Sequence, residues 1–335
     1  MCSRVFWRKE KLVSRTMDLP YFDKPRIYIL PKGIENKKYS EYTWKSKYDS
    51  LVINEVGTPD IISEGMNECG LAAHLLSLLC AKYPKHNYCK PTLHFGLWVK
   101  TILDQASTVQ EAVNLHNEFC LSAKYKTWPI LGSVLESYAG FHLAIEDAHG
   151  DCAVIEYVDG NFEPKIYRGY DASVVTNEPT LDCHLQNVRK YYPFGNHILP
   201  GGSLPQERFV RLAALKELLT EAPSSINNRL QTINAICSTA ITPGCVDDVE
   251  YAIANVSHDI FPTTWRVTSD LKNLKFYFIA DGSHRGIYRT LEIDFKKYLP
   301  VKNIKVCMNP YTEDLRDYGC CPEDCEAWSE TKGEE

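Results

Sequence analysis

Strand-like and helix-like segments alternate along the 335 residues of this chain without a repeat period, and this pattern limits the possible folds more than any other feature. Runs rich in β-branched and aromatic residues predict strands over 26–30, 50–54, 140–146, 152–158, 172–176, 263–270, 274–280 and 291–295. Apolar residues at helical spacing predict two helices within 93–119 and further helices over 181–188, from Pro205 onward and from Ser225 to about Ala240. Strands with antiparallel connections, flanked by helical pairs, predict an α+β layered architecture.

Local signals sharpen several of these elements. Thr108 precedes Glu111 by three residues, the capping-box spacing, and Pro205 occupies the first turn of its helix. Turns at 148–151 and 159–160 predict that the strands over 140–158 and 172–176 form one antiparallel meander, and a turn at 272–273 predicts a hairpin. The segment 61–79 is ambiguous, because it opens like a strand and continues into the apolar run LAAHLLSLL.

Composition predicts one large domain. Hydrophobic residues make up 44% and charged residues 24%, as in ordinary globular proteins, and no long polar or Pro/Gly/Ser-rich stretch marks a boundary. We therefore expect a single domain over 2–310 and a polar tail over 311–335. The net charge of −6 comes without a block of like charge, which argues against a nucleic-acid partner.

The N-terminus and the cysteines bear on location. MCSRVFWRKEKLVSR has no apolar signal region, and no run of about 18 apolar residues occurs elsewhere, so we expect a cytoplasmic protein without a membrane span. The 13 cysteines are an odd number, mostly in apolar contexts such as LLCAKY and INAICST, which favours reduced, buried thiols. The CCPEDC segment of the tail lacks paired Cys-x-x-Cys spacing and a nearby histidine, so no metal site is predicted.

Cys2 is the most informative single residue. Removal of Met1 normally requires a small second residue, and Cys2 would then carry both a thiol and a free α-amine. An α-amine has a pKa near ~8, so it can act as a general base at neutral pH beside its own nucleophile. Two other interpretations compete. Cys2 could be a poorly ordered terminal residue, or a lipid acceptor beside the basic residues at 4, 8, 9 and 11.

Several spaced motifs carry a family resemblance. SRTMD, which contains Arg15 and Asp18, resembles the signature of the choloylglycine hydrolase family, which includes penicillin V acylases and bile salt hydrolases. Further segments match in the same order: SEGMNECGLAAHLL over 63–76, VVTNEPTLDCHL over 174–185, LPGGSLPQERFVRLAAL over 199–215, and TTWRVTSDLKNLKFYF from residue 263. Together they extend from Cys2 to about Phe295, and their joint agreement is far more specific than any one motif.

The resemblance implies an N-terminal nucleophile hydrolase, with a four-layer αββα sandwich of antiparallel sheets and no cofactor. It makes Cys2 the nucleophile, with Arg15 and Arg208 beside the thiol, Asp18 at the α-amine and Asn177 as a donor to the oxyanion. Such guanidinium groups favour a thiolate, and an amide N–H stabilises the charge that develops on a tetrahedral oxygen. Without the resemblance, Asn177 would be read as a turn residue and Arg208 as an exposed helix charge.

Other candidates have weaker support. His74 and His142 lie in apolar stretches and would serve a Cys-His hydrolase, although core histidines bonded to the backbone are commoner. Ser77 stands where family members often carry a side-chain amide or a tyrosine, which puts its contact with the substrate in doubt. Aromatic residues expected near the mouth of the site, as binders of an apolar acyl group, are Tyr21, Phe22 and Trp128.

These observations predict hydrolysis of a linear amide with an apolar acyl part, through a thioester on Cys2. Leu71-Ala72-Ala73 and Trp265-Arg266 resemble the Gram-negative penicillin V acylases, some of which act on N-acyl homoserine lactones, and acylase activity on such lactones is therefore an alternative. A catalytically inactive acyl-amide binding homologue that keeps Met1, and a lipid-anchored interaction protein, are further alternatives. The resemblance also implies a homotetramer.

Overall fold

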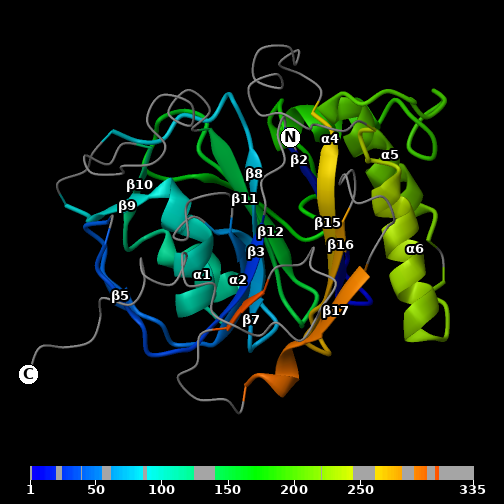
Figure 1. The fold of residues 1–335 in the computed structure, drawn as a ribbon. Coiled ribbons are helices and arrows are strands. Elements are labelled where there is room, and N and C mark those ends of the chain that lie inside the picture. The colour runs from blue at the N-terminus through cyan, green and yellow to red at the C-terminus, as the bar shows by residue number, and fades with distance from the viewer. Residues whose placement is uncertain are drawn as a thin grey trace, which may run out of the picture.

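A computed structural model of the chain describes residues 2–19, 25–38, 40–54, 62–85, 89–123, 140–219, 221–243, 261–280, 290–299 and 306–308. Two antiparallel sheets pack face to face, and helices cover the outer face of each sheet (Figure 1). The helices α1 and α2 lie on one side, and α5 and α6 lie on the other. The predicted α+β, four-layer αββα sandwich is confirmed.

The six-stranded sheet carries the start of the chain, and its strand order is β14-β1-β2-β15-β16-β17. Its strands are β1 (Cys2–Trp7), β2 (Leu12–Asp18), β14 (Val174–Val175), β15 (Thr263–Asp270), β16 (Lys275–Ala280) and β17 (Thr290–Asp294). The eight-stranded sheet has the order β13-β12-β11-β8-β7-β6-β3-β18. Its strands are β3 (Arg26–Leu30), β6 (Ser50–Asn54), β7 (Ile62–Asn67), β8 (Ala72–Ser77), β11 (Phe141–Glu146), β12 (Cys152–Glu156), β13 (Lys165–Arg168) and β18 (Val306–Met308).

The helices begin where the sequence signals place them. They are α1 (Trp98–Gln105), α2 (Val109–Leu115), α4 (Leu181–Val188), α5 (Pro205–Glu217) and α6 (Ile226–Ser238). The hydroxyl of Thr108 accepts the N–H of Glu111 and so caps α2, while the Glu111 carboxylate bonds Ser107. Pro205 occupies the start of α5, where its missing N–H costs nothing, and Ser225 caps α6.

Short elements complete the described chain. They are the pair β4 (Glu35–Asn36) and β5 (Trp44–Lys45), the parallel pair β9 (Thr92–His94) and β10 (Cys120–Ser122), and the 3-10 helices η1 (Phe95–Leu97) and η2 (Phe295–Lys297). None of the helices in the described ranges is long and apolar enough to cross a bilayer.

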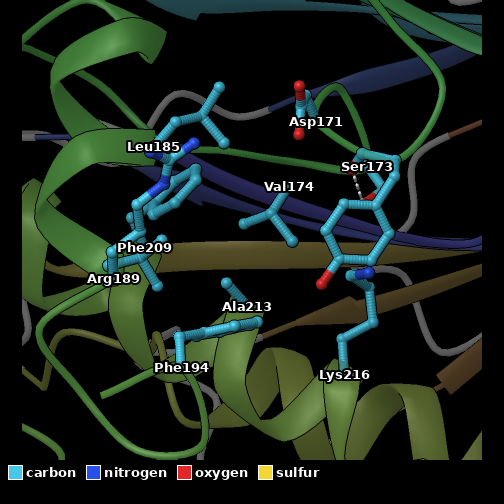
Figure 2. Close-up of a pocket in the computed structure, with 11 residues that line it drawn as sticks. Asp171, Ser173, Val174, Leu185, Arg189, Phe194, Phe209, Ala213 and Lys216 are labelled. Carbon is cyan, nitrogen blue, oxygen red and sulfur yellow. Dashed lines mark hydrogen bonds between the residues drawn. The ribbon is translucent and has the colours of Figure 1, made fainter.

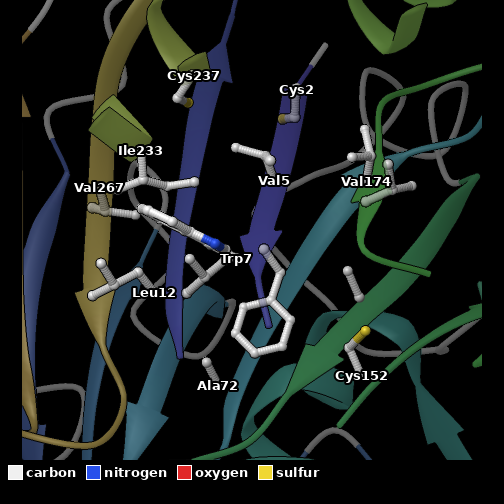
Figure 3. Packing of buried hydrophobic residues seen from close by; sticks show 14 of the residues in the cluster. Cys2, Val5, Trp7, Leu12, Ala72, Cys152, Val174, Ile233, Cys237 and Val267 are labelled. Atoms are coloured by element: carbon white, nitrogen blue, oxygen red, sulfur yellow. The ribbon is translucent and has the colours of Figure 1, made fainter. Parts of the chain in front are cut away.

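Two buried clusters fill the sandwich. The inner cluster joins the facing surfaces of the two sheets with α5 and α6, and Cys2 belongs to it at the end of β1 (Figure 3). The outer cluster lies between the eight-stranded sheet and α1 and α2. Alternation along β8 sends Ala72 and Leu76 into the inner cluster, and Ala73 and Leu75 into the outer one. All residues of β1 and β2 are buried, because both faces of their sheet are covered.

The expected meander over 140–176 is wrong at its third strand. β11 and β12 pair as predicted, but the next strand in that sheet is β13, and the sequence reasoning missed it. β13 has the sequence KIYR and is largely exposed at the sheet edge, so it lacks the apolar pattern of a buried strand. The segment 172–176 instead contributes β14, which pairs with β1 in the other sheet.

The local sequence pattern left one segment undecided and misplaced one cysteine. The ambiguous segment 61–79 is a hairpin of β7 and β8, turning at Gly70, whose φ of +77° suits glycine. Cys69, Cys80, Cys89 and Cys183 are exposed. The expectation of a buried thiol in LLCAKY is therefore wrong, because Cys80 lies beyond the end of β8. The tail over 311–335, with its CCPEDC segment, lies outside the described residues.

Candidate active site

Cys2 occupies the first position of β1, with 4% of its surface exposed. The β1–β2 hairpin pairs Cys2 with Met17 and Arg4 with Arg15, which places Arg15 diagonally across from Cys2 on the same face. The Cys2 sulfur lies 3.3 Å from Nη2 of Arg15 and 3.7 Å from Sδ of Met17. The sequence reasoning missed this hairpin. The available sequence signal was a pair of short apolar runs joined by RKEK. In the structure, Lys11 in this turn has a φ of 58°.

The backbone nitrogen of Cys2 is held by Asn177. Asn177 follows β14, and the pairing of Arg4 with Val175 brings it level with Cys2. Its Oδ1 accepts the Cys2 N–H at 2.6 Å, and its Nδ2 donates to the carbonyl oxygen of Ser77 at 2.8 Å. The sulfur and the nitrogen of Cys2 are therefore both in contact with candidate residues.

Arg208 lies on α5, and its guanidinium links the other residues of the site by hydrogen bonds. Its Nη1 donates to the Cys2 carbonyl oxygen at 3.0 Å and to Oδ2 of Asp18 at 3.1 Å, and its Nη2 donates to Oδ1 of Asn177 at 3.0 Å. The hydroxyl of Thr263 on β15 donates to the other Asp18 oxygen at 2.7 Å. Arg208 and Asp18 are both fully buried. The structure thus brings together all five residues of the predicted catalytic set, and their chemical roles stay predictions.

The candidates with weaker support lie around these five residues. Ser77 contacts Asn177 through its backbone carbonyl. His74 on β8 lies between two buried glutamates, Glu64 and Glu146. His142 on β11 lies 3.1 Å from Oε1 of Glu156 and 2.8 Å from the carbonyl oxygen of Thr176, the residue before Asn177. The predicted aromatic acyl binders Tyr21, Phe22 and Trp128 lie outside the described residues.

His184 is a site residue that the sequence reasoning did not single out. Its Nε2 lies 2.9 Å from the carbonyl oxygen of Asn177, and its ring stacks on Phe209 with centroids 4.7 Å apart. Burial lowers the pKa of His184 to about 4, so the ring is neutral at pH 7 and Nε2–H donates to Asn177. The available signal was its place in the motif, seven residues after Asn177 at the start of α4.

A cavity lies next to this group of residues, because Phe209, which stacks on His184, also lines the cavity. It has a volume of about 180 Å³ and lies between α4, α5 and the segment before β14 (Figure 2). Leu185 and Arg189 line it from α4, and Phe209 and Lys216 line it from α5. None of the five predicted catalytic residues lines this cavity. Among the residues that the structure describes, no group of three or more His, Cys, Asp and Glu side chains could hold a metal ion.

Comparisons with known proteins identify the family. The family model for linear amide C–N hydrolases of the choloylglycine hydrolase family matches residues 2–285. A penicillin V acylase of Pectobacterium atrosepticum is 30% identical over 288 residues, which cover 80% of this chain and 73% of that protein. A bile salt hydrolase/transferase of Clostridium perfringens is 23% identical over 268 residues, which cover 71% of this chain and 78% of that protein.

Solved structures share the fold. The penicillin V acylase from Agrobacterium tumefaciens superposes with a TM-score of 0.75 at 25% identity, covering 92% of this chain and 91% of that one. A mutant of the conjugated bile acid hydrolase from Clostridium perfringens superposes with a TM-score of 0.69 at 20% identity, covering 89% of this chain and 93% of that one. The second likeness is evidence for the fold alone.

Proposed function

The chain belongs to the choloylglycine hydrolase family of linear amide C–N hydrolases, and we propose that its nucleophile is Cys2, the N-terminal residue once Met1 has been removed. One observation carries the proposal: the Cys2 sulfur lies 3.3 Å from the Arg15 guanidinium while the Cys2 nitrogen lies 2.6 Å from Asn177. A guanidinium at this distance favours the thiolate by charge attraction. The nitrogen, once freed, is a base near neutral pH.

The reaction proceeds through a thioester. The thiolate attacks the amide carbonyl carbon, a C–S bond forms, and the carbonyl electron pair moves to the oxygen. Asn177 Nδ2 has two N–H groups, one bound to Ser77, and the second donates to this oxyanion together with a backbone N–H. The C–N bond breaks, and the amine leaves with a proton from the α-ammonium. Water deprotonated by the α-amine then attacks the thioester, which releases the carboxylic acid and restores the thiolate.

Asp18 and Arg208 orient the free α-amine. Removal of Met1 replaces one peptide N–H on Cys2 with three N–H groups, of which Asn177 Oδ1 accepts one. Asp18 accepts another, and its carboxylate is fixed for this by Arg208 at 3.1 Å and by Thr263 at 2.7 Å. Arg208 also donates to the Cys2 carbonyl oxygen, so it holds the nucleophile's backbone as well as the carboxylate.

The substrate is a linear amide with an apolar acyl part. The higher identity to a penicillin V acylase than to a bile salt hydrolase/transferase favours penicillin V-like amides over conjugated bile salts. N-acyl homoserine lactones are the second candidate class within the family. The homotetramer and the cytoplasmic location expected from the sequence stay predictions, and light scattering of the purified protein tests the former.

Amine release from penicillin V, a conjugated bile salt and an N-acyl homoserine lactone tests the proposal. The variants are Cys2→Ser and a chain with one extra residue between Met1 and Cys2. Cys237→Ser is the matched control, since Cys237 is a buried cysteine of the same inner cluster. Intact-mass measurement reports whether Met1 has been removed or an acyl group added.

We expect wild type and Cys237→Ser to release amine, and both Cys2 variants to be inactive. Activity that survives the blocked N-terminus would contradict the mechanism and point to an internal cysteine. Silence of all proteins on all three substrates, with Met1 retained, would favour the acyl-amide binding homologue. An added acyl mass on Cys2 would favour the lipid-anchored protein.

A further inference from the structure

A line of buried charged side chains begins on the six-stranded sheet, runs across three neighbouring strands of the eight-stranded sheet, and returns to the six-stranded sheet beside Cys2. Each member comes from a different strand, and each is at most 2% exposed. In spatial order they are Arg4 on β1, Glu146 on β11, His74 on β8, Glu64 on β7 and Arg15 on β2. Strand alternation explains the layer, because Glu64, His74 and Glu146 have the same parity as Met66, Leu76 and Ala144 of the inner cluster.

Both ring nitrogens of His74 face a glutamate oxygen, and two such contacts require one proton more than a neutral ring supplies. Its Nδ1 lies 3.1 Å from Oε2 of Glu64, and its Nε2 lies 2.5 Å from Oε1 of Glu146. A neutral imidazole has only one N–H. If both glutamates were ionised, the other ring nitrogen and the carboxylate oxygen that it faces would both be hydrogen-bond acceptors, with no proton between them. One proton is therefore shared between the ring and a carboxyl group that faces it.

Arg15 transmits this arrangement to the nucleophile. Its Nη1 lies 3.3 Å from Oε2 of Glu64, the same oxygen that His74 contacts. Its Nη2 donates to the carbonyl oxygen of Leu75 at 3.0 Å and lies 3.3 Å from the Cys2 sulfur. The guanidinium also lies 5.2 Å from the Trp265 ring. The position of Arg15 against the sulfur thus depends on a carboxylate that His74 holds.

We propose that His74, held between Glu64 and Glu146, is a positioning residue that fixes Arg15 on the Cys2 sulfur and gives the buried line a net positive charge facing the thiolate. The two arginines and two glutamates cancel, so the shared proton leaves one positive charge, and Arg15 is the member that faces the sulfur. This inference rests on the proposed Cys2 mechanism.

The pKa of His74 is lowered overall, so the shared proton follows from the two ring–carboxylate contacts and not from the titration of the ring. Burial lowers the pKa of His74, whereas the bond to Glu64 raises it and the charges of Arg4 and Arg15 lower it further. Burial also lowers the pKa of Arg4 to about 10, which leaves its guanidinium charged at neutral pH, with the Cys152 thiol on β12 beside it. The groups that face His74 are thus Glu64, Glu146 and the two arginines.

The test is the pH dependence of iodoacetamide alkylation at Cys2, followed by mass spectrometry of the peptide that contains it. The reaction needs no substrate, so it remains informative if the proposed hydrolysis fails. The variants are His74→Gln and His74→Asn. Asn places its amide near ring Nδ1 and keeps a donor to Glu64, whereas Gln places it near Nε2 and keeps only the donor to Glu146. Kinetics with the panel substrates are measured in parallel.

We expect both variants to move the acid limb of the alkylation profile upward by about one pH unit, because both lose the shared proton near the thiolate. His74→Asn should retain more of the plateau kcat than His74→Gln, with little change in KM, because it keeps Glu64 in place. His116→Gln is the matched control. It removes another buried imidazole, which contacts Trp98 and the Ala112 carbonyl in the outer layer. The control should leave the profile unchanged.

Profiles that match wild type in the His74 variants, or that move equally in His116→Gln, would overturn the proposal. If His74→Gln fails to fold, the profile of His74→Asn decides alone. A shifted alkylation profile in a protein that cleaves none of the substrates would refute the proposed hydrolysis and leave the positioning role standing.

Discussion

The inner and outer buried layers, which contain the inner and outer clusters, differ in how their buried charged side chains are paired. The outer layer contains the ion pair between Lys100 and Asp104, four residues apart on α1, and Trp44 donates to the same carboxylate at 2.7 Å. The inner layer contains arginines and carboxylates from several strands and from α5, far apart in sequence, and two of these arginines, Arg15 and Arg208, contact Cys2. A helix satisfies the first pair locally, as i,i+4 neighbours.

The difference bears on function. Taking charges out of water is costly, and buried ion pairs often contribute no more than well-packed apolar residues would. Perturbed, buried ionisable groups concentrate at functional sites. A cluster that needs several separate strands and ends at the proposed nucleophile is best explained by the chemistry proposed for it, whereas the outer pair is explained by structure alone. Matched substitutions in the two layers test this distinction.

The largest effect is expected from Arg208→Ala. The substitution leaves the buried carboxylate of Asp18 without its guanidinium, which should lower the free energy of unfolding by about 3 to 5 kcal/mol. Amine release should fall on the order of 10³-fold, since Arg208 holds both Cys2 and Asn177. The control is Arg211→Ala on the next turn, because Arg211 bonds backbone carbonyls of Pro200, Gly202 and Thr239. Equal losses of activity per folded molecule would contradict a catalytic role.

Asn177→Ala should follow in size. It removes the proposed oxyanion donor, so kcat should fall by about 10²-fold or more with a smaller change in KM. Asn67→Ala in the outer layer is matched, because the Asn67 amide is also buried and donates to the carbonyls of Leu103 and Ala106. We expect both variants to lose about 1 to 3 kcal/mol of stability. Only Asn177→Ala should lose activity, and a similar kcat loss in Asn67→Ala would sink the assignment.

His184→Phe should have a moderate effect on activity. It keeps a ring on Phe209 but leaves the Asn177 carbonyl without its donor, so kcat should fall about tenfold as Asn177 shifts. His184→Gln restores an amide donor and should recover part of the rate. His116→Phe, in the outer layer, should reduce thermal stability without a comparable loss of kcat. Absence of rescue by Gln, with the loss in Phe retained, would argue against the hydrogen bond as the cause.

The smallest difference between the layers is expected in acid stability. Burial lowers the pKa of His116 and of His184 to about 4, below the usual value of about 6.5. Each ring is neutral in both states above pH ~6.5, and below that the unfolded state binds more protons. Stability is therefore full above pH ~6.5 and falls toward pH 4, by about 1 kcal/mol per pH unit for each ring.

Denaturant melts from pH 7 to pH 4 check this slope. Replacing either histidine with Gln should make the dependence of stability on pH less steep, because about one proton fewer is taken up on unfolding, whichever layer the histidine occupies. An unchanged slope in both variants would show that these rings do not govern acid stability.

Local signals predicted much of the fold. The starts of α5 and α6, the Thr108 cap and the β15–β16 hairpin rest on residues within a few positions of each other, so a short window suffices to see them. The motifs around Arg15, Asn177 and Arg208 also pointed to the residues that now surround Cys2. β13 was missed because its exposed edge residues lack an apolar pattern.

The sequence by itself determined the family, the layered α+β class and the identity of the candidate catalytic residues, because those depend on residue types and their order along the chain. Only the tertiary structure decided that β14 pairs with β1 in the other sheet, and that His74 links Glu64 to Glu146. It also decided that His184 supports Asn177. The physical reason is that register, sheet partner and site geometry depend on contacts between residues far apart in the sequence, such as Cys2 and Asn177, which are 175 positions apart, and no local pattern encodes them.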